Sequence, residues 1–232
     1  MQYMGSKSRV AKHILPIMLE NRNGRTWVEP FVGGANMIDK VKGSRIGADN
    51  NRQVIDALVM IRDCPTDLPK NNLEYTEKDY NRAKNSDFSN PIDCFAMFTY
   101  SFGYKFRGGW SRAKDGKDYV GIAYRVAQKQ SPKLKDIDFV HSCYQELEVP
   151  NNSLIYCDPP YEGTTKYKGG FDHSEFWEWC RVKAKEGHQV FISEYNAPND
   201  FKEVWSKESY TNFDSNRTTK DVRVEKLFVY CG

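Results

Sequence analysis

Short apolar runs that alternate with helical segments are the feature that most restricts the fold of this 232-residue chain. Helical spacing of apolar residues is found over 6–21, where Pro16 is expected to kink or limit the helix, over 54–61, and over 173–187. Runs with strand composition lie at 25–31, 44–49, 136–144, 153–157, 188–195 and 225–230. This alternation predicts an α/β domain with a mostly parallel sheet and helices on both faces.

The alternation of strands and helices is interrupted between residues 53 and 135. The aromatic-rich stretch 93–106 is expected to begin as a helix, and 102–121, with its five glycines, has the composition of a loop. Nine basic and two acidic residues lie between Gly103 and Lys135, a local charge of +7 in a chain whose net charge is +3. We therefore predict a core domain of 1–52 and 136–232, with an inserted, mainly helical subdomain at 53–135. That subdomain is expected to face a polyanion, with a solvated basic surface as the alternative.

Composition argues against several classes of protein. Mean hydropathy is −0.73, and no apolar run approaches the roughly 18–20 residues that span a bilayer. The N-terminal residues lack the apolar stretch of a secretory signal, so a cytoplasmic protein without membrane contact is expected. The six cysteines are dispersed, with neither a CxxC pair nor zinc-like spacing to histidine, so we expect reduced thiols and no metal.

Two of the predicted strands end in residues suited to a nucleoside. The first runs into "VEPFVGGAN", with Glu29 followed by Gly33 and Gly34, and the second ends in "GADNN", with Asp49. Ligands of open α/β sheets bind at the carboxyl ends of strands, where glycines allow close approach and an acid can accept ribose hydroxyls. Without a GxGxxG motif or a P-loop lysine, a ligand lacking phosphates fits better than NAD or ATP. A plain glycine turn with a capping Asp49 is the alternative.

A third strand runs into Asp158-Pro159-Pro160-Tyr161, which would face the same edge of the sheet. The prolines fix the backbone and supply no N–H, so nearby carbonyls are available to a ligand. A carboxylate, a carbonyl and an aromatic ring together suit a planar group that bears an NH₂. The motif therefore favours chemistry on an amine, with an ordinary turn as the alternative.

Taken in order, "EPFVGG", "GADNN" and "DPPY" resemble the Dam-like, class-alpha DNA adenine-N6 methyltransferases. "YMGSK" (3–7) is similar to their N-terminal motif, "FISEYNAP" and "TTKDVRVEKLFVY" to their later strands, and "FGYKFRGGWSR" to solitary phage-encoded members. The resemblance implies a Rossmann-like methyltransferase fold, S-adenosylmethionine as cofactor and no metal. It also implies a catalytic domain of 1–52 and 136–232, and a target-recognition subdomain that binds DNA at 53–135.

The resemblance assigns site residues by position. The catalytic residues would be Asp158, Pro159, Pro160 and Tyr161. Where the family often has Asp-Phe, this chain has Cys143-Tyr144, so an acidic contact to the cofactor would be absent. The expected cofactor-binding residues are Tyr3, Met4, Gly5, Ser6, Lys7, Glu29, Pro30, Phe31, Gly33, Gly34, Asp49, Asn50, Cys143, Tyr144 and Asp158.

DNA contacts are expected from the basic, aromatic-rich part of the insertion and from the C-terminal region. Packing of the aromatics and solvation of the charges are the alternative for each residue. The region "KDYVGIAYRVAQ" lacks the Asn-x-Pro of members that methylate GATC, so the target could be GATC or another short or relaxed site. The candidates are Tyr104, Lys105, Phe106, Arg107, Trp110, Arg112, Arg217 and Lys220.

The sequence thus predicts an enzyme that transfers a methyl group from S-adenosylmethionine to the N6 amine of a flipped adenine in double-stranded DNA. No obligate protein partner is evident, and the expected use is protection of DNA from restriction. Methylation of cytosine N4 or of adenine in RNA stays open, because the DPPY chemistry does not distinguish these amines. A catalytically silent nucleic-acid-binding relative is the third possibility, although it would not need Lys7, Asp49 and Asp158 together.

Overall fold

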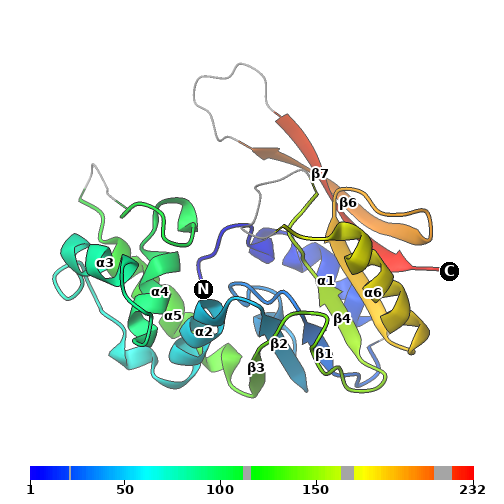
Figure 1. The fold of residues 1–232 in the computed structure, drawn as a ribbon, viewed down its shortest axis with the longest axis horizontal. Helices are drawn as coiled ribbons and strands as arrows, with labels where there is room; N and C mark the ends of the chain where they lie inside the picture. The colour runs from blue at the N-terminus through cyan, green and yellow to red at the C-terminus, as the bar shows by residue number, and fades with distance from the viewer. Residues whose placement is uncertain (21, 112–115, 163–169, 212–220) are drawn as a thin grey trace.

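The centre of the molecule is a seven-stranded sheet with the strand order β3-β2-β1-β4-β5-β7-β6. The computed structural model describes residues 1–20, 22–111, 116–162, 170–211 and 221–232 (Figure 1). β1 to β5 run parallel to one another, whereas β7 is antiparallel to both β5 and β6. The strands are β1 (Trp27–Glu29), β2 (Arg45–Asp49), β3 (Ile137–His141), β4 (Leu154–Cys157), β5 (Gln189–Glu194), β6 (Phe201–Thr211) and β7 (Asp221–Tyr230).

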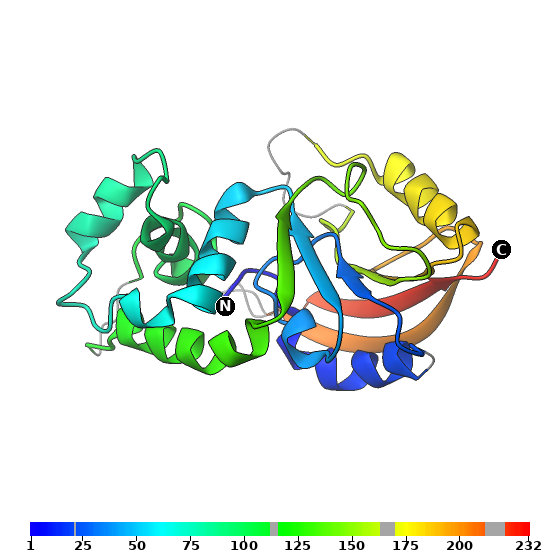
Figure 2. The same cartoon turned by 90° about the horizontal axis from the view of Figure 1, so that it is seen from below.

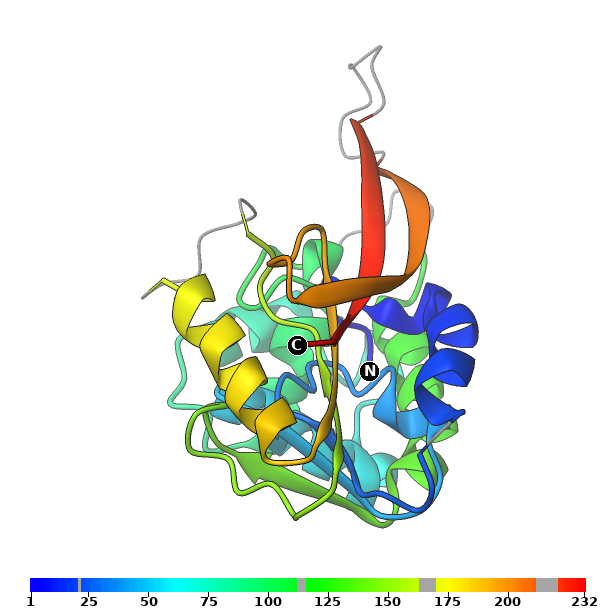
Figure 3. The same cartoon turned by 90° about the vertical axis from the view of Figure 1, so that its right-hand side faces the viewer.

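Helices lie on both faces of the sheet, with α1 on one side and α6 on the other (Figure 3). The helices between β2 and β3 form a group beside the sheet (Figures 1 and 2). The α-helices are α1 (Ala11–Leu19), α2 (Arg52–Asp63), α3 (Glu77–Lys84), α4 (Pro91–Thr99), α5 (Tyr119–Leu134) and α6 (His173–Lys185). Short 3₁₀ helices are η1 (Lys7–Arg9), η2 (Ile38–Lys40), η3 (Pro65–Asp67) and η4 (Phe102–Tyr104).

The buried strand β4 shows why the central strands are apolar throughout. Leu154 and Tyr156 belong to the core that includes α1, α2, α4 and α5, whereas Ile155 and Cys157 belong to the core beneath α6. All four side chains are buried. A parallel strand covered on both faces has no solvent side, so its sequence does not alternate with polar residues.

The predicted fold class is confirmed, since the sheet is mostly parallel and is covered on both faces. Each of the six predicted strands is present with shifted ends, and Gly187, at a φ of 91°, follows α6 as expected. α1 continues past Pro16 to Leu19. The division into two domains stays a prediction.

Two elements differ from the sequence-based expectation. α5 begins at Tyr119, inside the stretch predicted to be a loop, because Asp118 caps it by accepting a hydrogen bond from the Gly121 N–H at 2.9 Å. β6 was not predicted, because its sequence "FKEVWSKESYT" has few apolar residues. It lies at the edge of the sheet, where charged side chains are common. Among the described residues, no helix combines the length and apolar character required to cross a membrane.

Candidate active site

A large cleft opens at the carboxyl ends of β1, β2 and β4. These strands are adjacent, because β1 pairs in parallel with β2 on one side and with β4 on the other. The cleft has a volume of about 2110 Å³. Single small-molecule pockets typically measure about 300–1,000 Å³, so this cleft has room for more than one small ligand.

The loop after β1 is held against the end of β2 by the Asp49 carboxylate. The backbone N–H of Gly33 donates to Asp49 Oδ2 at 3.1 Å, and that of Asn51 donates to Oδ1 at 2.9 Å. Burial raises the pKa of Asp49 to about 6, although both hydrogen bonds oppose the shift. Gly33 has a φ of 47°, which an L side chain rarely adopts.

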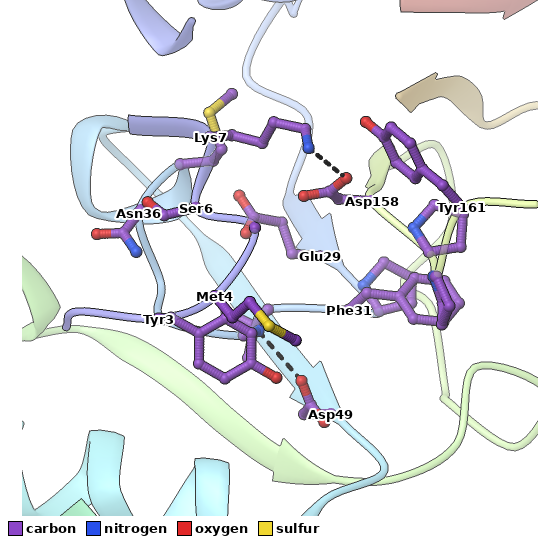
Figure 4. A pocket seen from close by; sticks show the side chains of 18 of the residues that line it. Tyr3, Met4, Ser6, Lys7, Glu29, Phe31, Asn36, Asp49, Asp158 and Tyr161 are labelled. Atoms are coloured by element: carbon purple, nitrogen blue, oxygen red, sulfur yellow. Dashed lines mark hydrogen bonds and ion pairs between the residues drawn. The ribbon is translucent and has the colours of Figure 1, made fainter. Parts of the chain in front are cut away.

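The next residue, Gly34, has no room for a side chain. A Cβ there would lie 2.7 Å from the Met1 carbonyl oxygen, 2.7 Å from Tyr3 Cβ and 2.5 Å from Asn36 Nδ2. The N-terminal segment therefore crosses directly over the glycine loop, and this brings Tyr3 and Met4 beside Asp49 (Figure 4).

Lys7 and Asp158 form an ion pair within the cleft (Figure 4), and Lys7 Nζ lies 3.1 Å from Asp158 Oδ1. Their side chains are 9% and 22% exposed. Burial raises the pKa of Asp158, and the charge of Lys7 opposes this rise. Burial alone would lower the pKa of Lys7, but the negative charges of Asp158 and Glu225 outweigh it, so this pKa is raised.

Tyr161 extends the same group, since Lys7 Nζ lies 4.6 Å from the centre of its ring. The ring of Tyr195 meets that of Tyr161 edge-on, with centroids 4.6 Å apart. Beside them, the buried Glu194 at the end of β5 accepts a hydrogen bond from the Glu162 N–H at 2.7 Å. Glu194 therefore fixes the backbone that follows the DPPY motif.

Glu29 is a buried acid on the floor of the cleft, between Lys7 and Phe31 in Figure 4. Its Oε1 accepts a hydrogen bond from Trp27 Nε1 at 2.8 Å. Burial raises the pKa of Glu29 well above its ordinary value. The group can therefore be protonated, and so act as a donor, at a pH where an exposed glutamate is charged.

An aromatic wall lies next to the loop after β1. The ring of Phe31 is 5.5 Å from that of Tyr144 and 5.9 Å from that of Phe171. Phe176 lies beneath them, with its ring 5.7 Å from that of Phe31. This wall offers an apolar surface to a planar ring, whereas Asp49 and the glycine loop offer polar groups.

Every residue that the sequence assigned to catalysis or to the cofactor lines this one cleft. The segments 3–7, 29–34, 49–50, 143–144 and 158–161 therefore converge, although their roles stay predictions. Sequence reasoning missed Glu194, Tyr195 and Phe171. Glu194 and Tyr195 lie within the "FISEYNAP" stretch noted above, but no spacing signal indicated that they contact the loop after β4.

The candidates for DNA contact are divided between two environments. Tyr104 lines the cleft, and its hydroxyl accepts a hydrogen bond from Gln2 Nε2 at 3.3 Å, whereas Lys105 and Arg107 are exposed. Phe106 stacks on Phe98 with ring centroids 4.8 Å apart, and Trp110 packs on Tyr80 at 5.4 Å. The last two thus follow the packing alternative in this structure. Arg112, Arg217 and Lys220 lie outside the described residues.

In the described part of the chain, no three His, Cys, Asp or Glu side chains are grouped so as to hold a metal ion. The six cysteines carry free thiols, and the buried ones, Cys94, Cys157 and Cys180, pack in the cores of the molecule.

Residues 3–106 match the model of the D12 class N6 adenine-specific DNA methyltransferases. The match includes the N-terminal segment, the glycine loop and Asp49 at the end of β2. With the mostly parallel, doubly covered sheet, it identifies a Rossmann-like methyltransferase fold. The matched residues make up slightly less than half of the chain, and over them the chain is similar to the D12 class of N6 adenine-specific DNA methyltransferases. The finer assignment to Dam-like, phage-encoded members stays a prediction.

Two curated relatives extend the similarity beyond residue 106. The chain is 26% identical over 213 residues to the type II methyltransferase M.FokI of Planomicrobium okeanokoites. This alignment covers 79% of the chain and 32% of M.FokI. The chain is also 25% identical over 189 residues to the modification methylase StsI of Streptococcus sanguinis. That alignment covers 71% of the chain and 29% of StsI. The chain thus spans about a third of the length of these relatives.

Among solved structures, one similar chain is SMU.472, described as a methyltransferase complexed with SAH. The similarity has a TM-score of 0.35 and 12% identity, and it covers 98% of this chain and 53% of that one. This TM-score is too low to establish a shared fold.

Proposed function

We propose that the protein transfers a methyl group from S-adenosylmethionine to the N6 amine of an adenine in double-stranded DNA. The observation that carries the proposal is the convergence of Asp158 with the glycine loop and Asp49 at one sheet edge. The family match over residues 3–106 and the two relatives, both of them methylases by name, support the same reaction.

The residues around the glycine loop fit S-adenosylmethionine. Gly34 lets the N-terminal segment cross close to the glycine loop at the cleft, and the Asp49 carboxylate can accept hydrogen bonds from ribose hydroxyls. The aromatic wall at Phe31 and Tyr144 suits the cofactor's adenine ring. When bound, the cofactor supplies a methyl group activated by its positively charged sulfur.

Asp158 acts on the amine that receives the methyl group. In an adenine the N6 lone pair is delocalised into the ring, which makes the nitrogen a weak nucleophile. The Asp158 carboxylate and the Pro159 carbonyl accept hydrogen bonds from the two N6 hydrogens, which favours a localised lone pair. The same acceptors stabilise the positive charge that develops on nitrogen in the transition state.

Lys7 keeps Asp158 in the charged form that this role requires. Its ammonium group opposes the rise in the pKa of Asp158 caused by burial. Tyr161, whose ring centre lies 4.6 Å from Lys7 Nζ, offers its ring for stacking against the adenine. Glu194, through the Glu162 N–H, holds this part of the chain in place.

A base stacked inside a duplex cannot reach a side chain within a cleft, so the adenine has to leave the helix. The exposed cations Lys105 and Arg107 lie beside Tyr104 at the cleft, where they can bind phosphates. The biological role that fits this activity is modification of DNA in the cytoplasm. If the chain is phage-encoded, this is the cytoplasm of the host cell. Such modification would protect the DNA against restriction at GATC or at another short site.

The test is direct. The purified protein is incubated with methyl-labelled S-adenosylmethionine and duplex DNA of mixed sequence, and the nucleosides are analysed by mass spectrometry. N6-methyladenine is expected, and sequencing for modified bases then identifies the target motif. N4-methylcytosine would instead favour methylation of cytosine N4. Label in an RNA substrate that is tested in parallel, without label in DNA, would favour methylation of adenine in RNA. No label in either nucleic acid would contradict methyl transfer and leave a silent binding protein.

A further inference from the structure

Glu225 is an acidic residue of β7 that takes no part in the reaction described above. Its side chain is half-buried and lines the same cleft as Asp158. β7 lies next to β5, beyond the strands whose carboxyl ends form the rest of the cleft. Glu225 thus brings a carboxylate to the proposed site from a strand that contributed none of the residues assigned to catalysis or to the cofactor.

The register of β6 and β7 fixes which side chains face the cleft. Glu225 lies opposite Lys207, and both line the cleft. The next residue of β7, Lys226, forms an ion pair with Glu203 at 3.0 Å, and neither of these two lines the cleft. Because successive side chains of a strand point to opposite faces, Glu225 faces the cleft and Lys226 faces away from it.

The charge of Glu225 acts on the ion pair of Lys7 and Asp158, whose charged atoms are 3.1 Å apart. Burial would lower the pKa of Lys7, but the charge of Asp158 and then that of Glu225 raise it. Burial raises the pKa of Asp158, Lys7 opposes the rise, and the charge of Glu225 adds to it. One ammonium group therefore faces two carboxylates, so these three side chains carry a negative charge in excess.

Acidic residues outnumber basic ones along the lining of the cleft. Among the described residues, eight Asp or Glu and three Lys or Arg line it. The chain as a whole has a net charge of +3, so the acidic lining is a local feature. A cleft lined with one sign of charge concentrates ligands of the opposite sign. This lining therefore favours a cationic ligand over an anion such as a DNA phosphate.

S-adenosylmethionine and its product differ in charge, because the sulfur of the methyl donor is a positively charged sulfonium. In the transfer, the electron pair of the broken S–CH₃ bond stays on sulfur, and a new bond joins the methyl group to N6. The positive charge moves to nitrogen and leaves with a proton, while S-adenosylhomocysteine keeps an uncharged sulfur. A negative charge near this sulfur thus stabilises the bound donor more than the bound product.

We propose that Glu225 provides the negative charge by which the cleft binds S-adenosylmethionine in preference to S-adenosylhomocysteine. Asp158 alone gives little preference, because Lys7 lies 3.1 Å away and offsets its charge. The inference rests on the proposed function and adds a residue that determines the specificity of that site. Glu225 acts through its charge, so a replacement that keeps the charge keeps the preference.

Isothermal titration calorimetry at low salt tests this preference with three ligands. They are S-adenosylmethionine, S-adenosylhomocysteine and sinefungin, an analogue in which a cationic amine replaces the methylsulfonium group. Glu225→Gln removes the charge with little change of shape, and Glu225→Asp keeps the charge. Glu203→Gln is the matched control, because it removes the same charge from the same pair of strands outside the cleft.

For Glu225→Gln we expect both cationic ligands to bind about fivefold more weakly or worse, as for the loss of one nearby, partly screened charge. S-adenosylhomocysteine should bind within about twofold of wild type, since its sulfur is uncharged. Glu225→Asp and Glu203→Gln should leave the affinities for all three ligands within about twofold of wild type. Thermal melting verifies folding, and Glu225→Thr is a second neutral variant that suits a strand.

Equal weakening of all three ligands by both neutral variants would overturn the inference, since lost packing rather than lost charge would explain it. Unchanged affinities in these variants, or the same selective loss in Glu203→Gln, would overturn it as well. These titrations contain no DNA, so their outcome does not depend on which base is methylated. If the wild-type protein binds none of the three ligands, the proposed function itself has failed.

Discussion

At the residue scale, Lys7 and Asp158 stabilise each other's charge, because both charged side chains are mostly buried. An ion pair of this kind is costly to break, since the remaining charge stays buried without its partner. The sequence indicated both residues as parts of separate motifs, one near the N-terminus and one after β4. Their pairing could not be predicted, because it arises only where the N-terminal segment crosses the sheet edge.

The first prediction concerns the pH dependence of methyl transfer. Asp158 must be charged to accept hydrogen bonds, so activity falls as pH decreases through its pKa. Lys7 lowers that pKa, and its removal allows burial to raise it further. Lys7→Gln should therefore move the acid limb of kcat to higher pH at saturating cofactor. The exposed Lys12→Gln is the control, and an acid limb that stays in place in Lys7→Gln would contradict this role.

The second prediction concerns cofactor affinity and Asp49. Its pKa of about 6 means that the carboxylate is charged above that pH and protonated below it. Because the charged form is the better acceptor for ribose hydroxyls, affinity for S-adenosylmethionine should rise from pH 5 to pH 7, with its midpoint at about pH 6.

Isothermal titration calorimetry across this range tests the Asp49 prediction. Asp49→Asn should bind with a flat pH profile and about 10- to 100-fold more weakly, the amount expected for a lost hydrogen bond to a charged group. An unchanged profile in the variant would show that another group causes the pH dependence.

At the scale of elements, the glycine loop and the N-terminal segment form one unit. Gly34→Ala would place a Cβ 2.7 Å from the Met1 carbonyl oxygen, so the segment has to shift. We expect a loss of about 1–3 kcal/mol in the free energy of unfolding, as for other overpacked sites, together with weaker cofactor binding. Gly109→Ala, with no heavy atom within 4 Å of the added Cβ, is the matched control and should leave both quantities unchanged.

The strands were predictable because burial on both faces makes them continuously apolar, as β4 shows. β6 was not predicted for the opposite reason. It lies at an exposed edge, and charged residues such as Lys202, Glu203 and Lys207 interrupt its apolar pattern. Glu194 was missed as a site residue because its function depends on a single hydrogen bond to the Glu162 N–H. Such contacts have no periodicity that a sequence could display.

At the scale of the whole molecule, the exposed cations Lys105 and Arg107 follow Tyr104, which lines the cleft. The logarithm of the binding constant for duplex DNA should fall linearly with the logarithm of the salt concentration, because phosphate contacts release counterions. The double variant Lys105→Glu/Arg107→Glu should reduce the magnitude of the salt slope by about 2.

The control for this salt dependence is Lys42→Glu/Lys202→Glu. Both control residues are exposed, and neither lines the cleft. Lys42 precedes β2, and Lys202 lies at the start of β6. The measurement is fluorescence anisotropy of a labelled duplex from low to high salt. Equal slopes for the two double variants would mean that the loop does not contact phosphates.

The central claim is that Asp158 carries methyl transfer to adenine, and single-turnover kinetics with Asp158→Asn test it most directly. The variant is saturated with labelled S-adenosylmethionine and duplex DNA, and Asp138→Asn, an exposed residue of β3, is the control. We expect Asp158→Asn to bind both substrates yet form N6-methyladenine at least about 100-fold more slowly. Formation of N6-methyladenine by Asp158→Asn at close to the wild-type rate would contradict the account.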